Sequence, residues 1–245
     1  MVLDGRKKGR MTKLFGQKNY LETAPGPCAP EYIREMCEGL GFVLSDGALV
    51  ALSSYLALLV KWNRVMNLVG PSDWEDILSS LVIDSLYLAE FIQTLPLPEH
   101  PECRDLGAGA GLPGLPLRMI WQKGNYTLVE AREKRALFLR SCLAAAPLPG
   151  VSVYHGRAEA FMASAPHAHL TVSRAFLPWE RVLALVSPYT DNGSFCLFLT
   201  LSPLPSSLPE EWRPFAEKRY TAHNNDRYFW ALQKVAVPPP DAADL

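Results

Sequence analysis

The sequence of 245 residues lacks a long apolar segment. Its longest uncharged run, residues 192–209, contains three prolines and four serines, so it does not form an apolar helix of about 20 residues. The charged N-terminus is not followed by the apolar run of a secretory signal. These absences predict a cytoplasmic protein without a membrane span.

The sequence also lacks the usual patterns of disulfide and metal-binding proteins. Its five cysteines form no CxxC pair, which argues against a disulfide framework or a four-thiolate zinc site. His167 and His169 form an HxH pair, but no acidic or thiol side chain stands close to them in the sequence. We therefore expect reduced cysteines and no bound metal.

Charge is nearly balanced over the whole chain, at −1, but it is unevenly distributed. Residues 1–24 carry six lysines and arginines and two acidic residues, a net charge of +4, which leaves −5 for the remainder. Basic segments of this kind often contact polyanions such as nucleic acid, and a solvated tail is the alternative. Because Pro25 and Pro27 end this segment, we predict a basic arm and linker over residues 1–27.

The rest of the chain has the composition of a folded protein, with 49% hydrophobic and 20% charged residues. Residues 28–100 have the apolar spacing of amphipathic helices. Ser45 or Asp46 is expected to cap one helix, and a capping box from Ser72 to Glu75 is expected to begin another. We interpret this region as a helical N-terminal extension.

After His100, short β-rich runs alternate with helical ones. The expected strands cover residues 103–106, 126–130, 151–155, 170–173, 194–199, 219–223 and 228–235. Such alternation predicts an α/β fold of the Rossmann-like kind, a doubly wound and mostly parallel sheet. Turn residues at 224–226 predict that the sheet ends in an antiparallel hairpin. The predicted domain covers residues 101–238, and a disordered tail follows at 239–245.

The sharpest motif is a glycine-rich loop after the first expected strand. Gly109, Gly111 and Gly114 fit GxGxxG, which places a pyrophosphate on a helix N-terminus. Gly107, Gly109 and Gly111 also fit GxGxG after the acidic residue Asp105. A carboxylate here would repel a pyrophosphate and attract the ammonium and sulfonium groups of S-adenosylmethionine, which favours the second interpretation. In both, the glycines let the backbone approach the ligand closely.

Glu130 ends the second expected strand, 19 residues after the last glycine of GxGxG. In nucleoside-binding sheets a carboxylate at this point accepts hydrogen bonds from ribose hydroxyls. Arg132 and Lys134 could instead pair with Glu130, or receive the 2′-phosphate of NADP. Ala158 and Glu159 follow the third strand, where this class of fold reads the adenine edge, although Glu159 also suits a helix start.

Several separate motifs occur in the order found in one known family. They are Lys61-Trp62-Asn63 with Asn67-Leu68, Ile83-Asp84-Ser85, residues 105–116, Lys134-Arg135 with Phe138-Leu139-Arg140, Arg157-Ala158-Glu159 and Ser173-Arg174-Ala175-Phe176. With these motifs, residues 44–235 resemble the small-subunit ribosomal RNA guanine-N7 methyltransferases, also called glucose-inhibited division protein B. The resemblance implies a class I methyltransferase fold with S-adenosylmethionine as cofactor, and cofactor contacts at Gly107, Leu112, Ala158, Glu159 and Arg174.

The implied partner is small-subunit ribosomal RNA or the ribosomal subunit, bound by a monomer. Lys61, Asn63 and Asn67 lie near the end of an expected amphipathic helix and could face the RNA. Arg174 could hold the methionine carboxylate or an RNA phosphate, or form a structural salt bridge. Phe176 could stack on a flipped base or belong to the core.

The chain also departs from the family pattern. The Arg-His pair usual before Asp-Ser is replaced by Ser80 and Leu81, and the usual lysine at the end of the fifth strand is replaced in the stretch that contains Leu199. Both changes remove positive charge from the expected RNA face.

Guanine N7 is a nucleophile that carries no proton, so methyl transfer to it needs alignment but no general base. We therefore assign no catalytic residue. The sequence predicts a methyltransferase acting on small-subunit ribosomal RNA. The alternatives are an NADP-dependent oxidoreductase and a cofactor-binding RNA-interaction protein without turnover.

Overall fold

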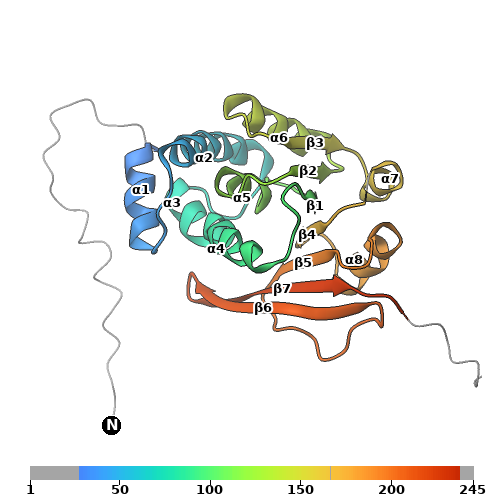
Figure 1. Ribbon diagram of the computed structural model, residues 1–245. Coiled ribbons are helices and arrows are strands. Elements are labelled where there is room, and N and C mark those ends of the chain that lie inside the picture. The colour runs from blue at the N-terminus through green and yellow to red at the C-terminus, as the bar shows by residue number, and fades with distance from the viewer. Residues whose placement is uncertain (1–27, 166, 238–245) are drawn as a thin grey trace, which may run out of the picture.

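The N-terminal region is helical in the computed structural model, which describes residues 28–165 and 167–237 (Figure 1). Its elements are α1 (Pro30–Gly39), α2 (Asp46–Met66), α3 (Trp74–Ile77), a π-helical turn (Leu78–Val82), α4 (Ile83–Phe91) and a 3₁₀ turn (Ile92–Thr94). Ser45 caps α2, because its Oγ accepts the Ala48 N–H at 3.3 Å. The predicted arm (residues 1–27) and tail (residues 239–245) lie outside the described residues.

The capping box predicted to begin at Ser72 is wrong by one residue. Asp73 is the N-cap of α3, and its Oδ1 accepts the Asp76 N–H at 2.9 Å. A carboxylate at this position also interacts favourably with the positive end of the helix dipole, which explains why Asp73 displaces the neighbouring serine.

Seven strands form one sheet in the order β3-β2-β1-β4-β5-β7-β6. The strands are β1 (Glu102–Leu106), β2 (Asn125–Glu130), β3 (Val151–His155), β4 (Leu170–Arg174), β5 (Phe195–Thr200), β6 (Trp212–Ala222) and β7 (Asn225–Lys234). β1 to β5 pair in parallel, whereas β7 is antiparallel to both of its neighbours. The predicted parallel sheet with a terminal antiparallel hairpin is confirmed.

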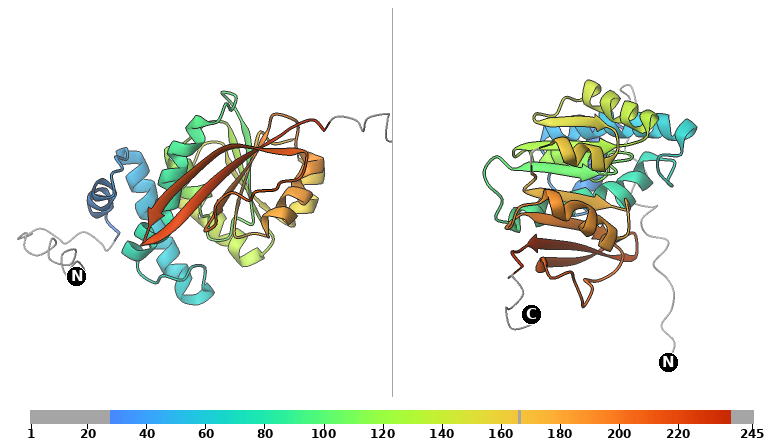
Figure 2. Two further views of the ribbon diagram at one scale, coloured as in Figure 1. Left: turned by 90° about the horizontal axis from the view of Figure 1, so that it is seen from below. Right: turned by 90° about the vertical axis from the view of Figure 1, so that its right-hand side faces the viewer.

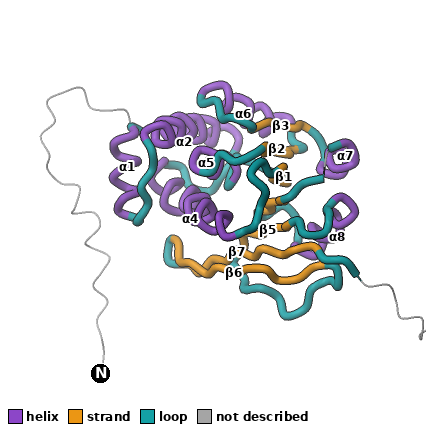
Figure 3. The backbone as a smooth tube through the Cα atoms, viewed as in Figure 1, coloured by secondary structure: helices purple, strands orange, loops and turns teal. Residues whose placement is uncertain are grey.

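Helices cover both faces of the sheet (Figures 1 and 3). The helices after residue 113 are α5 (Gly114–Ile120), α6 (Glu133–Ala145), α7 (Ala158–Ser164) and α8 (Trp179–Val186), which a 3₁₀ turn (Ser187–Tyr189) follows. Successive strand residues point to opposite faces: Leu128 joins a core formed with α2, α4, α5 and α6, and Val129 joins a second core formed with α7 and α8. The N-terminal helices therefore share the first core with the sheet.

The C-terminal hairpin is longer than expected and forms the edge of the sheet beside β5 (Figure 2). Its turn consists of His223 and Asn224, which have φ angles of 50° and 62°, the pattern of a two-residue type I′ turn. Asn225 and Asp226, expected in the turn, begin β7 instead. Asp226 Oδ2 accepts a hydrogen bond from Arg219 Nη2 across the hairpin at 2.6 Å, which stabilises this register.

The helical run Trp74–Thr94 is, among the described residues, long and apolar enough to cross a membrane by length and composition. This run is separate from residues 192–209, the longest uncharged stretch of the sequence. In the fold, 67% of its most apolar window is buried, and its apolar side chains Ile77, Leu78 and Leu88 lie in the first core. Packing within the protein accounts for the hydrophobic character of this segment.

Candidate cofactor site

The glycine loop leaves the carboxyl end of β1 in a conformation that requires glycine at several positions. Gly107, Gly109 and Gly111 have φ angles of 71°, 57° and 79°, in the region that side chains disfavour. The Gly107 and Ala108 N–H groups donate to the Val129 carbonyl at 2.9 and 3.0 Å, which ties the loop to β2. The loop is therefore held against the next strand before it enters α5.

Glu130 closes the other side of this loop. The residue is only 4% exposed, and its two carboxylate oxygens accept the N–H groups of Gly109 at 2.9 Å and Arg132 at 2.8 Å. Each oxygen retains a second lone pair. Glu130 is thus fixed in orientation and can accept a further hydrogen bond from a ligand hydroxyl.

A cavity of about 270 Å³ lies between these elements at the carboxyl ends of the strands. Its lining residues are Gly107, Val129, Glu130, Ala131, Arg132, Arg135, Gly156, Ala158, Ala175 and Phe176. The structure therefore brings together three of the predicted cofactor residues: Gly107 from the loop, Glu130 from β2 and Ala158 from the start of α7. This is the edge at which open α/β sheets bind ligands.

Phe176 also lines the cavity, although the sequence left it between base stacking and core packing. A Cβ added to Gly107 would lie 2.5 Å from Cδ2 of the Phe176 ring, so the ring packs directly on the glycine loop. The preceding Ala175 has a φ of 50°, an uncommon angle for a residue with a side chain. The backbone after β4 thus turns sharply and directs the ring toward the cavity.

Asp105 does not have the role on which the sequence argument relied. It is 1% exposed and faces the first core, where Tyr126 Oη donates to its Oδ2 at 3.4 Å. Burial raises its pKa to about 8 from an ordinary value of 3.8, so the carboxyl group is largely protonated at neutral pH. Asp105 is not among the residues that line the cavity, and its charge does not select between a pyrophosphate and a sulfonium.

The other three predicted cofactor residues lie outside the cavity lining. Leu112 is buried in the first core. Glu159 is exposed and pairs with Arg157 at 3.7 Å. Arg174 pairs with a carboxylate of the helical region, because its Nη2 lies 3.3 Å from Asp84 Oδ2. The structural salt bridge, one of the three roles expected for Arg174, is present.

The residues predicted to face RNA are separated from this cavity. Asn63 is 9% exposed, and its side chain bonds to the Pro71 carbonyl and the Val69 N–H, both at 2.9 Å, which orders the loop after α2. Asn67 is exposed and ends α2 with a φ of 47°. Lys61 lines a different depression of about 510 Å³ between α1 and α2. Of the three residues, Lys61 and Asn67 are exposed and could contact RNA, whereas Asn63 is buried.

No cluster of three potential metal ligands occurs in residues 28–165 and 167–237. His167 has an acidic neighbour that is distant in the sequence: its Nδ1 lies 2.7 Å from Asp191 Oδ1. The Nδ1 of His169 accepts the Glu102 N–H at 3.0 Å. Both histidines therefore contribute to connections between elements.

Comparison with known proteins identifies the family. The model of the GidB family, described as rRNA small subunit methyltransferase G, matches residues 48–202. A curated relative from Nitratidesulfovibrio vulgaris (strain DP4), named ribosomal RNA small subunit methyltransferase G, is 56% identical over 206 residues, which cover 84% of this chain and 94% of the relative. The chain belongs to the rRNA small subunit methyltransferase G family. A relative of the same name from Lawsonia intracellularis is 46% identical over 83% of this chain and 95% of its own length.

Solved structures show the same fold at low identity. A mutant of MtNAS in complex with S-adenosylmethionine superposes with a TM-score of 0.54, 15% identity and coverage of 84% of this chain and 78% of the other. The putative methyltransferase yhhF from Escherichia coli superposes with a TM-score of 0.50 and 17% identity, and the match covers 62% of this chain and 86% of the other. The resemblance predicted from the sequence motifs, both in family and in fold, is confirmed.

Two positions at which this member of the rRNA small subunit methyltransferase G family lacks the expected basic residues are buried. Ser80 is 8% exposed and its Oγ donates to the Asp76 carbonyl. Leu199 is 9% exposed and packs in the first core. A hydroxyl and an apolar side chain fit these sites without a charge that would need a partner.

Proposed function

We propose that this chain transfers a methyl group from S-adenosylmethionine to guanine N7 of small-subunit ribosomal RNA. The observation that carries the proposal is the cavity over the glycine loop, closed by the buried Glu130, in a chain of this methyltransferase family. The bound cofactor supplies an electrophilic methyl group on its sulfonium. The protein must bind and orient the two reactants.

The residues of the cavity fit this cofactor. Glu130 would accept hydrogen bonds from the ribose hydroxyls, and Ala158 would border the adenine at the start of α7. Gly107 provides the space in which the ligand lies on the loop, because it has no side chain. The prediction of cofactor contacts at Leu112, Glu159 and Arg174 depends on a closer approach of these residues once the cofactor is bound.

The chemistry requires positioning more than proton transfer. The ionisable residues that line the cavity are Glu130, Arg132 and Arg135. Glu130 is engaged by two backbone N–H groups, and arginine does not act as a base at neutral pH. Such a lining suits a nucleophile without a proton, such as guanine N7, for which alignment with the methyl group is sufficient.

Calorimetry and a methylation assay test the proposal. The full chain is titrated with S-adenosylmethionine, with its demethylated product and with NADPH. We expect binding of the first two, and tighter binding of NADPH would instead indicate the oxidoreductase alternative, in which Arg132 and Lys134 receive a 2′-phosphate. Methyl transfer to unmodified small-subunit ribosomal RNA, with N7-methylguanine detected by mass spectrometry, distinguishes an enzyme from a binding protein without turnover.

Replacing Glu130 with alanine is expected to weaken cofactor binding by about 1.5 to 3 kcal/mol, because a charge-assisted hydrogen bond is lost. Calorimetry with S-adenosylmethionine measures the change. Glu38→Ala is the matched control, since Glu38 is an exposed glutamate of α1 and lies outside the cavity lining. An unchanged dissociation constant for Glu130→Ala would show that another residue binds the ribose.

Removal of the basic arm is expected to reduce the salt dependence of RNA binding. If four of the six cations in residues 1–24 contact phosphates, a chain that begins at Ala24 has a slope of log affinity against log salt that is flatter by roughly 3. Affinity for S-adenosylmethionine stays the same, because the cavity is formed by residues 107–176. Equal slopes for the two chains would mean that the arm is only solvated.

A further inference from the structure

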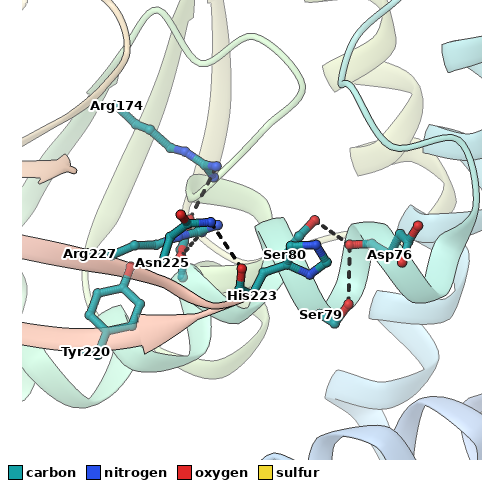
Figure 4. A network of polar contacts seen from close by, with 9 residues as sticks. Asp76, Ser79, Ser80, Arg174, Tyr220, His223, Asn225 and Arg227 are labelled. Carbon is teal, nitrogen blue, oxygen red and sulfur yellow. Dashed lines mark hydrogen bonds and ion pairs between the residues drawn. The ribbon is translucent and has the colours of Figure 1, made fainter. Parts of the chain in front are cut away.

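A buried carboxylate connects the helical region to three different strands of the sheet. Asp84, at the start of α4, accepts hydrogen bonds from Tyr220 Oη at 2.8 Å and from Arg227 Nη1, and it pairs with Arg174 Nη2 at 3.3 Å. Figure 4 shows the side chains of Arg174 and Arg227 converging on one point from β4 and β7. The π-helical turn Leu78–Val82 directly precedes α4, of which Asp84 is the second residue, and such turns often occur at functional sites.

This cluster carries more positive charge than its own carboxylate can balance. Two guanidinium groups share Asp84, whose side chain is 4% exposed, and the arginine side chains are 21% and 13% exposed. Burial and the adjacent Asp84 raise the pKa of Tyr220 above its ordinary range, so the phenol stays neutral. One net positive charge therefore remains in a site that is largely shielded from water.

The hydrogen-bonding capacity of the two arginines is also incompletely used. Arg174 Nη1 and Arg227 Nε are buried and have no acceptor among the described residues. Buried guanidinium groups are normally paired and hydrogen-bonded, because desolvating them is costly. An anion at the exposed side of this pair would balance the remaining charge.

The position of the pair indicates which anion it meets. Arg174 is followed directly by Ala175 and Phe176, which line the cavity. Arg227 lies on β7, separated from β4 by β5, and is not among the lining residues. Near it, the hairpin tip exposes the polar residues His223, Asn224 and Asn225. A ligand that reaches Arg227 must extend beyond the cofactor cavity across the sheet, as an RNA chain would.

We propose that Arg227, together with Arg174, binds a backbone phosphate of the RNA substrate and so positions the target base beside the cofactor. This inference rests on the proposed function. Asp84 acts as a positioning residue, because it holds both guanidinium groups in one place. Two arginines offer a phosphate several donors in fixed directions, a geometry that a single lysine cannot provide.

Arg227→Gln and Arg227→Lys in the full chain test the proposal. The RNA probe is transcribed, unmodified small-subunit ribosomal RNA, and binding is measured over a range of salt concentrations. For Arg227→Gln we expect RNA affinity to fall at least about tenfold, because a charge-assisted contact is lost, and the salt slope to flatten by about 0.7 for one phosphate. Affinity for S-adenosylmethionine is expected to stay unchanged. Arg227→Lys should keep the salt slope and recover part of the affinity.

Arg219→Gln is the matched control, because Arg219 is an exposed arginine on the neighbouring strand and pairs with Asp226. It removes the same charge from the hairpin and should leave RNA affinity unchanged. Thermal unfolding of each variant verifies the fold. If Arg227→Gln is unfolded, the test depends on Arg227→Lys. A loss of RNA affinity at an unchanged salt slope in that variant supports the proposal, and wild-type affinity overturns it.

The possible outcomes separate this inference from the proposed function. If Arg227→Gln binds RNA like the wild type, or loses affinity only as much as Arg219→Gln does, the phosphate site is wrong. If it loses affinity for S-adenosylmethionine and keeps the RNA salt slope, the pair binds the methionine carboxylate and the proposal is again overturned. If the wild-type chain itself neither binds nor methylates the RNA, the proposed function fails.

Discussion

Replacing Gly107 with valine is expected to abolish binding of S-adenosylmethionine. A side chain here would meet the Phe176 ring, since even a Cβ would lie 2.5 Å from Phe176 Cδ2. Both the glycine and the ring line the cavity, so the branched side chain would occupy the space over the loop or push the ring into it. The φ of 71° adds backbone strain. Calorimetry should show no heat of binding at concentrations that saturate the wild type.

A substitution at a second glycine, Gly193, distinguishes the effect of backbone strain from the effect of filling the cavity. Gly193 has a φ of 90°, but a Cβ added there would meet nothing within 4 Å, and the residue lies outside the cavity lining. Gly193→Val should therefore lose stability through strain alone and bind the cofactor normally. Normal binding by Gly107→Val, or equal loss of binding by both variants, would contradict a cofactor site on the glycine loop.

The parts of the site that were predictable are those formed by short stretches of sequence. Gly107 and Glu130 each belong to a strand-and-loop motif, and parallel strands bring their carboxyl ends to one edge of the sheet. Once the alternation of strands and helices is recognised, the proximity of these two residues follows. The five predicted parallel strands agree with β1 to β5 within one residue for the same reason, because each depends on its own run of apolar residues.

The parts that were not predictable depend on contacts between distant segments. Asp84, Arg174 and Arg227 meet only because β7 inserts beside β5 and α4 packs across the strand ends. Sequence alone placed Arg174 near the cofactor, but it could not supply the competing carboxylate from α4. The sequence also contained nothing that distinguished Arg227 from the other charged residues of the hairpin, which are expected to be exposed.

The hairpin turn was misplaced for a more local reason. Three polar residues at 224–226 suggested a loop of three, whereas the actual turn uses His223 and Asn224 at positive φ. The Arg219 and Asp226 side chains pair across the strands, and this contact favours the register that places Asp226 in β7. Cross-strand pairing of this kind becomes visible only when both strands are placed.

Asp105 is expected to make the free energy of unfolding depend strongly on pH. Its carboxyl group is buried beneath the glycine loop, and burial raises the pKa to about 8. The alternation of β1 explains the orientation: Asp105 shares the face of Cys103 in the first core, whereas Leu106 points to the second. A strand-end acid that looks like a ligand in the sequence is therefore directed into the protein.

The sign of the effect follows from the direction of the shift. Below pH about 4 both the folded and the unfolded chain keep the proton on Asp105, and its full contribution to stability is present. As the pH rises from about 4 to about 8, the unfolded chain loses the proton while the folded chain retains it. Within this window the free energy of unfolding falls by about 1.4 kcal/mol per pH unit for this one group, and above it the dependence ends.

Asp105→Asn removes this titration and keeps a side chain of similar shape that can still hydrogen-bond to Tyr126. We expect the variant to be about as stable as the wild type near pH 4 and more stable by a few kcal/mol at pH 8, measured by urea unfolding of the full chain at several pH values. Asp226→Asn is the control with the opposite sign, because Arg219 lowers the pKa of Asp226 at the protein surface. Parallel pH profiles for the wild type and Asp105→Asn would show that Asp105 is ionised in the folded protein, and its charge would then again be available to attract a cationic cofactor.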